Sequence, residues 1–196
     1  MSAHRLVVQD GEAGRVLTVL PGSGYTAQGP VLARPAAALR REGWTVRTVV
    51  WDGRPDPDDA RDVYADVLRD GVEAAPDAVH LVLAKSLGTL ALPVAVERGL
   101  PGAWLTPLLT VDGAPEVRAA AAGLGATGVP ALLAGGTADR LWDGALAAAS
   151  GARVLEVDGG AHSLEVDGDP DRTARALDAV TSAVVDLAAA VTASRD

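Results

Sequence analysis

The sequence predicts an α/β protein with a mostly parallel central sheet of about seven strands and helices on both faces. Two observations predict this class. Short runs rich in β-branched residues alternate with longer alanine-rich stretches, and most of the short runs are apolar throughout. Strands with continuous apolar character are typical of a sheet that helices cover on both sides. A length of 196 residues fits one domain, so we expect a single domain over 1–196.

The elements follow from this alternation. Strands are expected at 4–8, 15–20, 44–50, 78–84, 102–106, 130–135 and 152–157. Helices are expected at about 30–42, 57–75, 88–99, 115–124, 141–150 and 170–192. The first two strands are separated only by QDGEAG, so they could pair as an antiparallel hairpin at the edge of the sheet.

Composition excludes several classes of function. The net charge of -9 leaves no basic stripe for nucleic acid or an anionic membrane surface. The chain has no cysteine, and its histidines and carboxylates show no metal-ligand spacing, so no metal is expected. No run of about 20 apolar residues spans a membrane, and the start of the chain does not read as a secretory signal. We therefore expect a cytoplasmic protein; the sequence does not indicate its oligomeric state.

One serine follows a buried strand and precedes a turn of small residues, in the stretch LVLAKSLGTL. Ala84 lies two residues before Ser86, and Gly88 lies two residues after it. A nucleophile elbow of the G-x-S-x-G type needs small residues at both places, so that strand and helix can approach each other. The pattern is weak by itself, because a serine that caps a helix gives the same letters.

Two more side chains with acid–base chemistry follow later strands. Asp139 lies in TADRLWD, after the strand expected at 130–135, and His162 lies in DGGAHSLEV, after the strand expected at 152–157. The carboxyl ends of parallel strands meet at one edge, where α/β sheets bind ligands. A serine hydroxyl needs an imidazole to accept its proton, and the imidazole needs a carboxylate to hold its tautomer. We therefore expect Ser86, Asp139 and His162 to form a catalytic triad.

Other interpretations of these residues stay open. Asp139 could instead cap the helix that follows it, and His162 could be a solvated loop histidine. Asp112 and Asp143 could supply the acid, although Asp112 follows a different strand and Asp143 is expected within a helix. The other two histidines lie near the terminus and at the start of a strand, so neither is well placed as a base.

Acyl transfer also needs two amide donors for the developing oxyanion. The first is expected to be the amide of Leu87, directly after the nucleophile. The second is expected from the loop LPGSGYTAQGP, which follows the second strand. Ser23 is the first choice there, and Gly24 and Tyr25 remain alternatives.

With these residues in place, the chain resembles the α/β-hydrolase superfamily, specifically its small cap-less members of the dienelactone-hydrolase-like and carboxylesterase-like kind. The order serine, acid, histidine is that of the family, and the resemblance covers about residues 5–192. It implies a serine hydrolase for a small-molecule acyl substrate, without a cofactor. Ser86 would attack the acyl carbonyl, His162 would accept and return the proton, and Asp139 would orient His162.

The chain departs from the family in two substitutions and in its length, which is so short that we expect the sheet to lack a strand. Ala84 replaces a glycine, and Pro21 and Gly22 stand where the family often has histidine and glycine. The segment 106–129, where larger relatives insert a lid, has room for one helix only. An uncovered site favours a small or polar substrate over long lipid chains. An acyltransferase with the same triad, and an idle fold that binds a small molecule or a protein, remain open.

A nucleotide-binding interpretation competes with this one. GSGYTA matches G-x-G-x-x-A after a strand, and Asp52 ends the next strand about where a ribose-binding acid would lie. Against it, Gly29 and Pro30 favour a helix that begins at Pro30, so residues 22–29 form a loop and no tight turn onto a helix. It also leaves the serine, the acid and the histidine unexplained.

Lys85 is the only lysine of the chain and directly precedes Ser86. A lysine at the end of a buried strand needs a partner, and Asp52 on a neighbouring strand is the expected one. Alternatively, its charge could favour an anionic substrate or tune Ser86 and His162.

Four large side chains lie near the expected strand ends and could line an acyl pocket, although aromatic residues at such places more often pack in the core. They are Tyr25, Trp104, Leu108 and Trp142.

Overall fold

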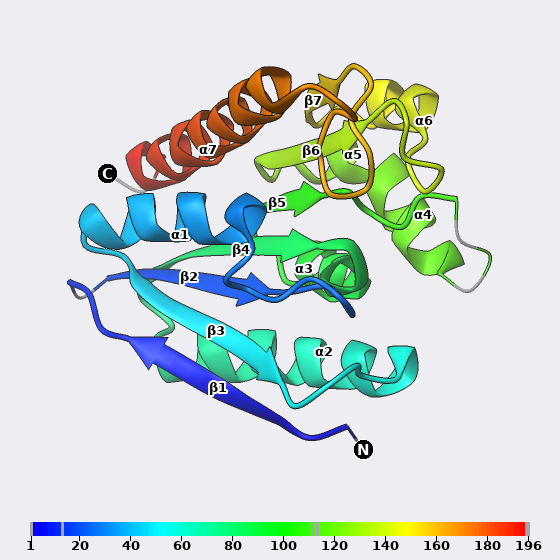
Figure 1. Cartoon of the computed structure of the whole chain (residues 1–196). Helices are drawn as coiled ribbons and strands as arrows, with labels where there is room; N and C mark the ends of the chain where they lie inside the picture. The colour runs from blue at the N-terminus through cyan, green and yellow to red at the C-terminus, as the bar shows by residue number, and fades with distance from the viewer. Residues whose placement is uncertain (1, 13, 111, 113, 195–196) are drawn as a thin grey trace.

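A seven-stranded sheet lies at the centre of the molecule, in the order β1-β3-β2-β4-β5-β6-β7 (Figure 1). A computed structural model describes residues 2–12, 14–110, 112 and 114–194. The strands are β1 His4–Gln9, β2 Arg15–Leu20, β3 Thr45–Trp51, β4 Val79–Lys85, β5 Gly102–Leu105, β6 Ala131–Gly136 and β7 Arg153–Val157. Every neighbouring pair is parallel except β1 with β3. The expected strands and the mostly parallel sheet are therefore confirmed.

Helices connect most of these strands. They are α1 Pro30–Arg41, α2 Pro57–Ala74, the 3-10 helix η1 Ser86–Ala91, α3 Leu92–Glu97, α4 Pro115–Ala122, α5 Leu124–Thr127, α6 Gly144–Ala149 and α7 Pro170–Ala193. Four of the longer helices have proline at their first positions, where the missing amide proton has no intrahelical partner to lose. The helix expected at 88–99 is divided into η1 and α3.

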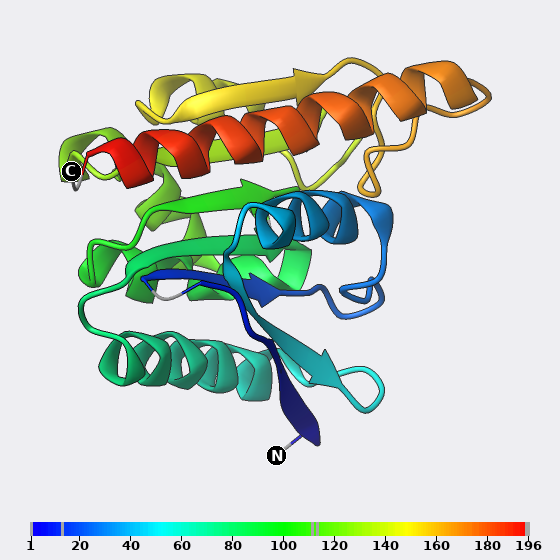
Figure 2. The same ribbon diagram turned by 90° about the vertical axis from the view of Figure 1, so that its left-hand side faces the viewer.

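The helices form one layer on each face of the sheet. Helices α1 and α7 lie side by side on one face, and α2 and α3 lie on the other (Figures 1 and 2). Alternate residues of β4 serve the two layers, because successive side chains of a strand point to opposite faces. Leu81 and Leu83 pack with α1 and α7, whereas Val82 and Ala84 pack with α2 and α3. Burial on both faces explains the continuous apolar run from Leu81 to Ala84 within β4.

The expected hairpin between the first two strands does not form. Strand β1 is antiparallel and lies at the edge, but its partner is β3. Strand β2 pairs with β3 on one side and β4 on the other, so it has no free edge for β1. Its residues after Arg15 are all buried, whereas every residue of β1 is exposed. The more apolar strand takes the inner place.

Two segments bear on what covers the sheet. The described part of 106–129 contains α4 and the one-turn helix α5, one helix more than expected, and no lid domain is formed. Helix α7 is long and apolar enough to cross a membrane by length and composition alone. One side of α7 is buried among the core residues shared with α1 and the sheet, which is typical of a core helix in an α/β protein.

Candidate active site

Ser86 is the first residue of η1 and lies at the sharp turn that directly follows β4. Its φ is 52°, in the left-handed region that residues other than glycine rarely adopt. The helix that follows runs close to the end of β2. A methyl group on Gly88 would lie 2.1 Å from the carbonyl oxygen of Leu20, so only glycine fits there. This is the strand–turn–helix geometry of a nucleophile elbow, with Ala84 accommodated in the sheet.

The loops that carry the acid and the histidine are joined to each other. The amide of Ala138, after β6, donates a hydrogen bond to the carbonyl oxygen of Gly160, after β7, at 3.0 Å. A methyl group on Gly136 would lie 2.0 Å from the same oxygen. This close approach fixes Asp139 relative to His162, although 22 residues separate them in the sequence.

Asp139 uses its two carboxylate oxygens differently. Oδ1 accepts a hydrogen bond from the amide of Leu141 at 2.9 Å, and Oδ2 lies 2.7 Å from Nδ1 of His162. Its side chain is only 1% exposed. Asp139 therefore orients the histidine, and its other oxygen closes the turn that follows. The N-cap of the next helix, α6, is Asp143, so the alternative in which Asp139 caps that helix is wrong.

The His162 loop is anchored to the core by the residue that follows Ser163. Leu164 has a φ of 64° and is fully buried in the core between the sheet and α7. Its amide donates to the carbonyl of Ala161 at 2.8 Å, and the amide of Ala161 donates to the carbonyl of Glu165 at 2.8 Å. The turn carries His162 on a short, internally hydrogen-bonded loop.

The three side chains form one continuous hydrogen-bonded chain. Nε2 of His162 lies 2.8 Å from Oγ of Ser86, and Nδ1 lies 2.7 Å from Asp139. When Asp139 is ionised, Nδ1 carries the proton and donates it to Oδ2. Nε2 is then free to accept a hydrogen bond from the serine hydroxyl. This arrangement can take the proton of Ser86 as its oxygen attacks an electrophile.

The alternative acids and histidines lie elsewhere. Asp143 accepts a hydrogen bond from the amide of Leu146 as the N-cap of α6 and pairs with Arg118 at 2.8 Å. Asp112 is exposed in the loop after β5. Nε2 of His80 lies 2.8 Å from the carbonyl of Ala75.

The loop after β2 lies against the serine. A methyl group placed on Gly22 would lie 3.2 Å from Cβ of Ser86. The amide of Gly22 donates to the carbonyl of Tyr25 at 3.2 Å, whereas the amide of Ser23 has no acceptor among the described residues. The amide of Leu87 lies in the first turn of η1, where helical amides have no intrahelical acceptor. Within the described part of the chain, the amides of Ser23 and Leu87 therefore have no hydrogen-bond acceptor.

A pocket of about 420 Å³ opens over these groups, and we call it the serine pocket. It is lined by Gly22, Ser23, Gly24, Tyr25, Lys85, Ser86, Ala161, His162 and Ser163. Of the four side chains expected to line an acyl pocket, Tyr25 is therefore the one that the structure brings to the serine.

The other three pack in the core on the α2 and α3 face. Trp104 is 1% exposed, with its ring against Gly102. Trp142 packs its ring against Gly135 and donates from Nε1 to Glu156 at 2.7 Å. Leu108 is also buried in this cluster. For these three residues, proximity to a strand end did not predict a place in the pocket, because large apolar side chains there are drawn into the core.

Lys85 also differs from expectation. Nζ donates to the backbone carbonyl of His162 at 3.1 Å and lies 4.5 Å from the ring centroid of Tyr25. The expected partner, Asp52, forms an exposed ion pair with Arg5 at 3.8 Å instead. Burial lowers the pKa of Lys85 to about 8, and the negative charge of Asp139 opposes this shift.

The loop expected at 22–29 is present, and α1 begins at Pro30. The loop therefore lacks the tight turn onto a helix that a dinucleotide-binding fingerprint needs, as the sequence indicated.

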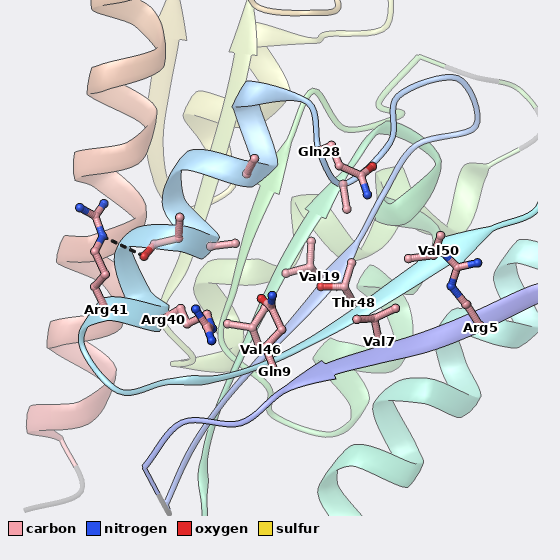
Figure 3. A pocket seen from close by; sticks show the side chains of 14 residues that line it. Arg5, Val7, Gln9, Val19, Gln28, Arg40, Arg41, Val46, Thr48 and Val50 are labelled. Atoms are coloured by element: carbon pink, nitrogen blue, oxygen red, sulfur yellow. Dashed lines mark hydrogen bonds between the residues drawn. The ribbon is translucent and has the colours of Figure 1, made fainter.

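A larger hollow, of about 690 Å³, lies away from Ser86 between α1 and the β1–β3 edge of the sheet (Figure 3). We call it the edge groove. Its floor includes Val7, Val46 and Val50, and Arg5 and Arg40 lie toward its two ends. None of Ser86, Asp139 and His162 lines it.

Comparison with known proteins identifies the fold. No family model matches the chain, and no curated protein matches its sequence. Est1E from Butyrivibrio proteoclasticus, solved with ferulic acid, is similar with a TM-score of 0.69 over 95% of this chain and 96% of that chain, at 12% identity. An α/β serine hydrolase homologue from Coxiella burnetii gives 0.68 over 94% and 91%, at 13% identity.

A third similar structure is an α/β serine hydrolase without a lid from Xanthomonas campestris. It gives a TM-score of 0.65 over 94% of this chain and 87% of that chain, at 16% identity. The described residues therefore have the α/β-hydrolase fold and form no lid domain, as the resemblance implied.

Proposed function

We propose that the protein is a serine hydrolase that cleaves a small or polar ester through an acyl-enzyme intermediate. The observation that carries the proposal is the hydrogen-bonded chain from Ser86 through His162 to Asp139, with the serine held at a positive φ. A helix-capping serine explains neither the strained backbone nor the imidazole at 2.8 Å.

The proposed reaction has two halves. Oγ of Ser86 attacks the ester carbonyl carbon while its proton passes to Nε2 of His162. The amides of Leu87 and Ser23 stabilise the oxyanion of the tetrahedral intermediate. The C–O bond of the ester then breaks, and the proton on Nε2 passes to the departing alcohol oxygen. Water attacks the acyl-enzyme by the same route, giving a carboxylic acid and free Ser86.

Throughout the cycle, the carboxylate of Asp139 stabilises the imidazolium form of His162 without taking its proton. Burial of this carboxylate at 1% exposure strengthens that interaction, because water screens it poorly.

The proposed substrate size follows from the serine pocket. A pocket of about 420 Å³ without a lid domain offers little apolar surface for a long acyl chain. Short acyl groups, or the exposed end of a larger molecule, fit such a site better. The serine hydrolases with similar structures support a hydrolase function, and the substrate itself is proposed from the pocket alone.

Hydrolysis of short-chain nitrophenyl esters tests the proposal. The parent protein should turn over nitrophenyl acetate, and Ser86→Ala and His162→Ala should each reduce the rate by about 10³-fold or more. Ser182→Ala, on the exposed side of α7, is the matched serine control and should keep the parent rate. Circular dichroism would establish that each variant is folded. A folded parent without turnover on any short ester, and without reaction with a fluorophosphonate, would refute the proposal.

A further inference from the structure

The mechanism proposed above does not use Lys85, the only lysine of the chain. Lys85 is only 1% exposed, although it directly precedes Ser86. An ammonium group loses its hydration inside a protein, and lysines are almost never fully buried unless they are paired. The contacts that hold this charge therefore need an explanation.

No carboxylate among the described residues forms an ion pair with Lys85. Its ammonium is held by a carbonyl dipole, that of His162 at 3.1 Å, and by the face of the Tyr25 ring at 4.5 Å. The ring is itself fixed, because the Tyr25 hydroxyl accepts a hydrogen bond from the amide of Val31 at 3.0 Å. Lys85 thus connects the β4 strand end to the start of α1 and to the His162 loop.

The bonded carbonyl belongs to the residue whose imidazole must reach Ser86. Asp139 and Ser86 hold the His162 side chain, and the buried Leu164 anchors the chain two residues later. Lys85 provides a hydrogen bond to the His162 backbone itself. Without it, the peptide that follows His162 could rotate and carry the imidazole away from the serine. A displacement of about 1 Å can cost about 10²-fold in rate.

We propose that Lys85 is a positioning residue, whose protonated amine holds the His162 backbone against Tyr25 so that the imidazole stays within reach of Ser86. This role rests on the proposed serine hydrolase function. The hold on the His162 backbone is expected to weaken as the pH rises and the amine loses its proton.

The positioning role depends on pH because the Lys85 amine can lose its proton. Burial lowers the pKa of Lys85 to about 8. The charged or titratable groups that face it are Asp139 after β6, His162 after β7 and Tyr25 in the loop after β2, with Glu165 acting on Tyr25. Above this pH the neutral amine makes a weaker hydrogen bond and loses its attraction to the ring. The serine should therefore react more slowly as the pH rises through this range.

The single lysine allows a direct measurement that does not depend on activity. Protein grown with ¹³C-lysine gives one lysine Cε resonance, whose shift reports the protonation of Lys85. We expect its midpoint near the lowered pKa, about 8. In Asp139→Asn the midpoint should fall further, because the charge that favours the ammonium is gone. A midpoint near 10.4, the value of a solvated lysine, would overturn the proposal.

The second measurement is the rate of labelling by a fluorophosphonate between pH 6.5 and 9.5. The parent rate should decline at high pH with the midpoint of the Cε resonance. Lys85→Met, which keeps the length and apolar stem, should label about 10- to 100-fold more slowly at pH 7 and show no such decline. Lys85→Arg stays charged throughout this range and should also show none, although its wider head fits poorly.

The outcomes separate the two proposals. If the parent labels and Lys85→Met keeps the same rate and the same decline, the positioning role is overturned and the hydrolase proposal stands. The positioning role is also overturned if both variants are slower at every pH but keep the decline, as a purely structural lysine predicts. A folded parent that labels at no pH overturns both. If Lys85→Met does not fold, a parent decline that does not coincide with the Cε midpoint still overturns the role.

Discussion

The edge groove and the serine pocket differ both in size and in the chemistry of the residues that line them. The edge groove is the larger, about 690 Å³ against about 420 Å³ for the serine pocket. Its walls are valines, alanines and exposed arginines on an outer part of the sheet. The serine pocket holds a residue with a strained backbone, a buried ammonium and a coupled serine–histidine–aspartate chain.

Their positions in the sheet explain this difference. Strand β1 is at an edge, so water reaches its side chains and Val8 is 49% exposed. Polar groups there keep their hydration, and their interactions with one another are weak. Strand β4 lies in the middle of the sheet, where charges are desolvated and must be held by specific partners. Backbone strain and buried charge, and not volume, therefore distinguish the pocket for which we propose catalysis.

The largest expected effect is a loss of ester hydrolysis when the acid of the serine pocket, Asp139, is replaced. In Asp139→Asn, Oδ1 can still accept from Leu141, but the amide nitrogen would face Nδ1 of His162 and favour the wrong tautomer. We expect ester hydrolysis to fall by about 10³- to 10⁴-fold, with the fold retained. Asp143→Asn is the matched control, since Asp143 caps α6 and pairs with Arg118. Equal rates in the two variants would remove Asp139 from the mechanism.

The next prediction concerns the elbow. Gly88→Ala would place a methyl group 2.1 Å from the carbonyl oxygen of Leu20, so η1 must move away from β2 and take Ser86 with it. We expect a loss of about 2–4 kcal/mol in unfolding free energy and little remaining esterase activity. Gly123→Ala is the control, because its methyl group would meet the nearest atoms at 3.7 Å. Denaturant unfolding that finds both variants equally stable would contradict the elbow geometry.

A smaller effect is expected on the free energy of unfolding, and it comes from the buried ammonium of Lys85. The pKa of Lys85 in the folded protein, about 8, lies below its value in the unfolded chain. The unfolded chain therefore binds more protons between these values, and stability from this group rises with pH through that window. We expect the parent to gain about 2 kcal/mol relative to Lys85→Met between pH 7 and 9.5. Urea unfolding at the two pH values measures this difference, and an unchanged difference would mean that the ammonium is solvated.

The smallest effects are expected in the edge groove. Val7→Thr and Arg40→Gln change exposed side chains at its floor and its rim. Both should leave ester hydrolysis within about twofold of the parent and unfolding free energy within about 0.5 kcal/mol. A large loss of activity in either variant would break the comparison, because it would give the groove a part in the reaction.

The sequence predicted the elements well because their signals are local. Apolar runs, prolines at helix starts and the small residues around Ser86 each specify their own neighbourhood. The grouping of Ser86, Asp139 and His162 was also predictable, since parallel strands bring their carboxyl ends to one edge. The three residues meet because each follows a parallel strand, whatever the order of these strands in the sheet.

The features that the sequence did not predict depend on competition between distant segments. Strands β1 and β2 are adjacent in the chain, yet β2 pairs with β3 and β4 because it is the more apolar strand. The partner of Lys85 is a backbone carbonyl, which every residue possesses, so no side chain in the sequence marks it. Trp104 lies next to a strand end but faces the core, and a strand end alone does not fix the direction of a side chain.

The most direct test of the account is the site of covalent reaction with a fluorophosphonate. Mass spectrometry of the treated, folded protein and of its peptides would locate the adduct among all serines of the chain. The account predicts one adduct per chain, on Ser86, which disappears in His162→Ala. An adduct on another serine, or a folded parent that forms none, would contradict the claim that the strained serine at the end of β4 is the nucleophile.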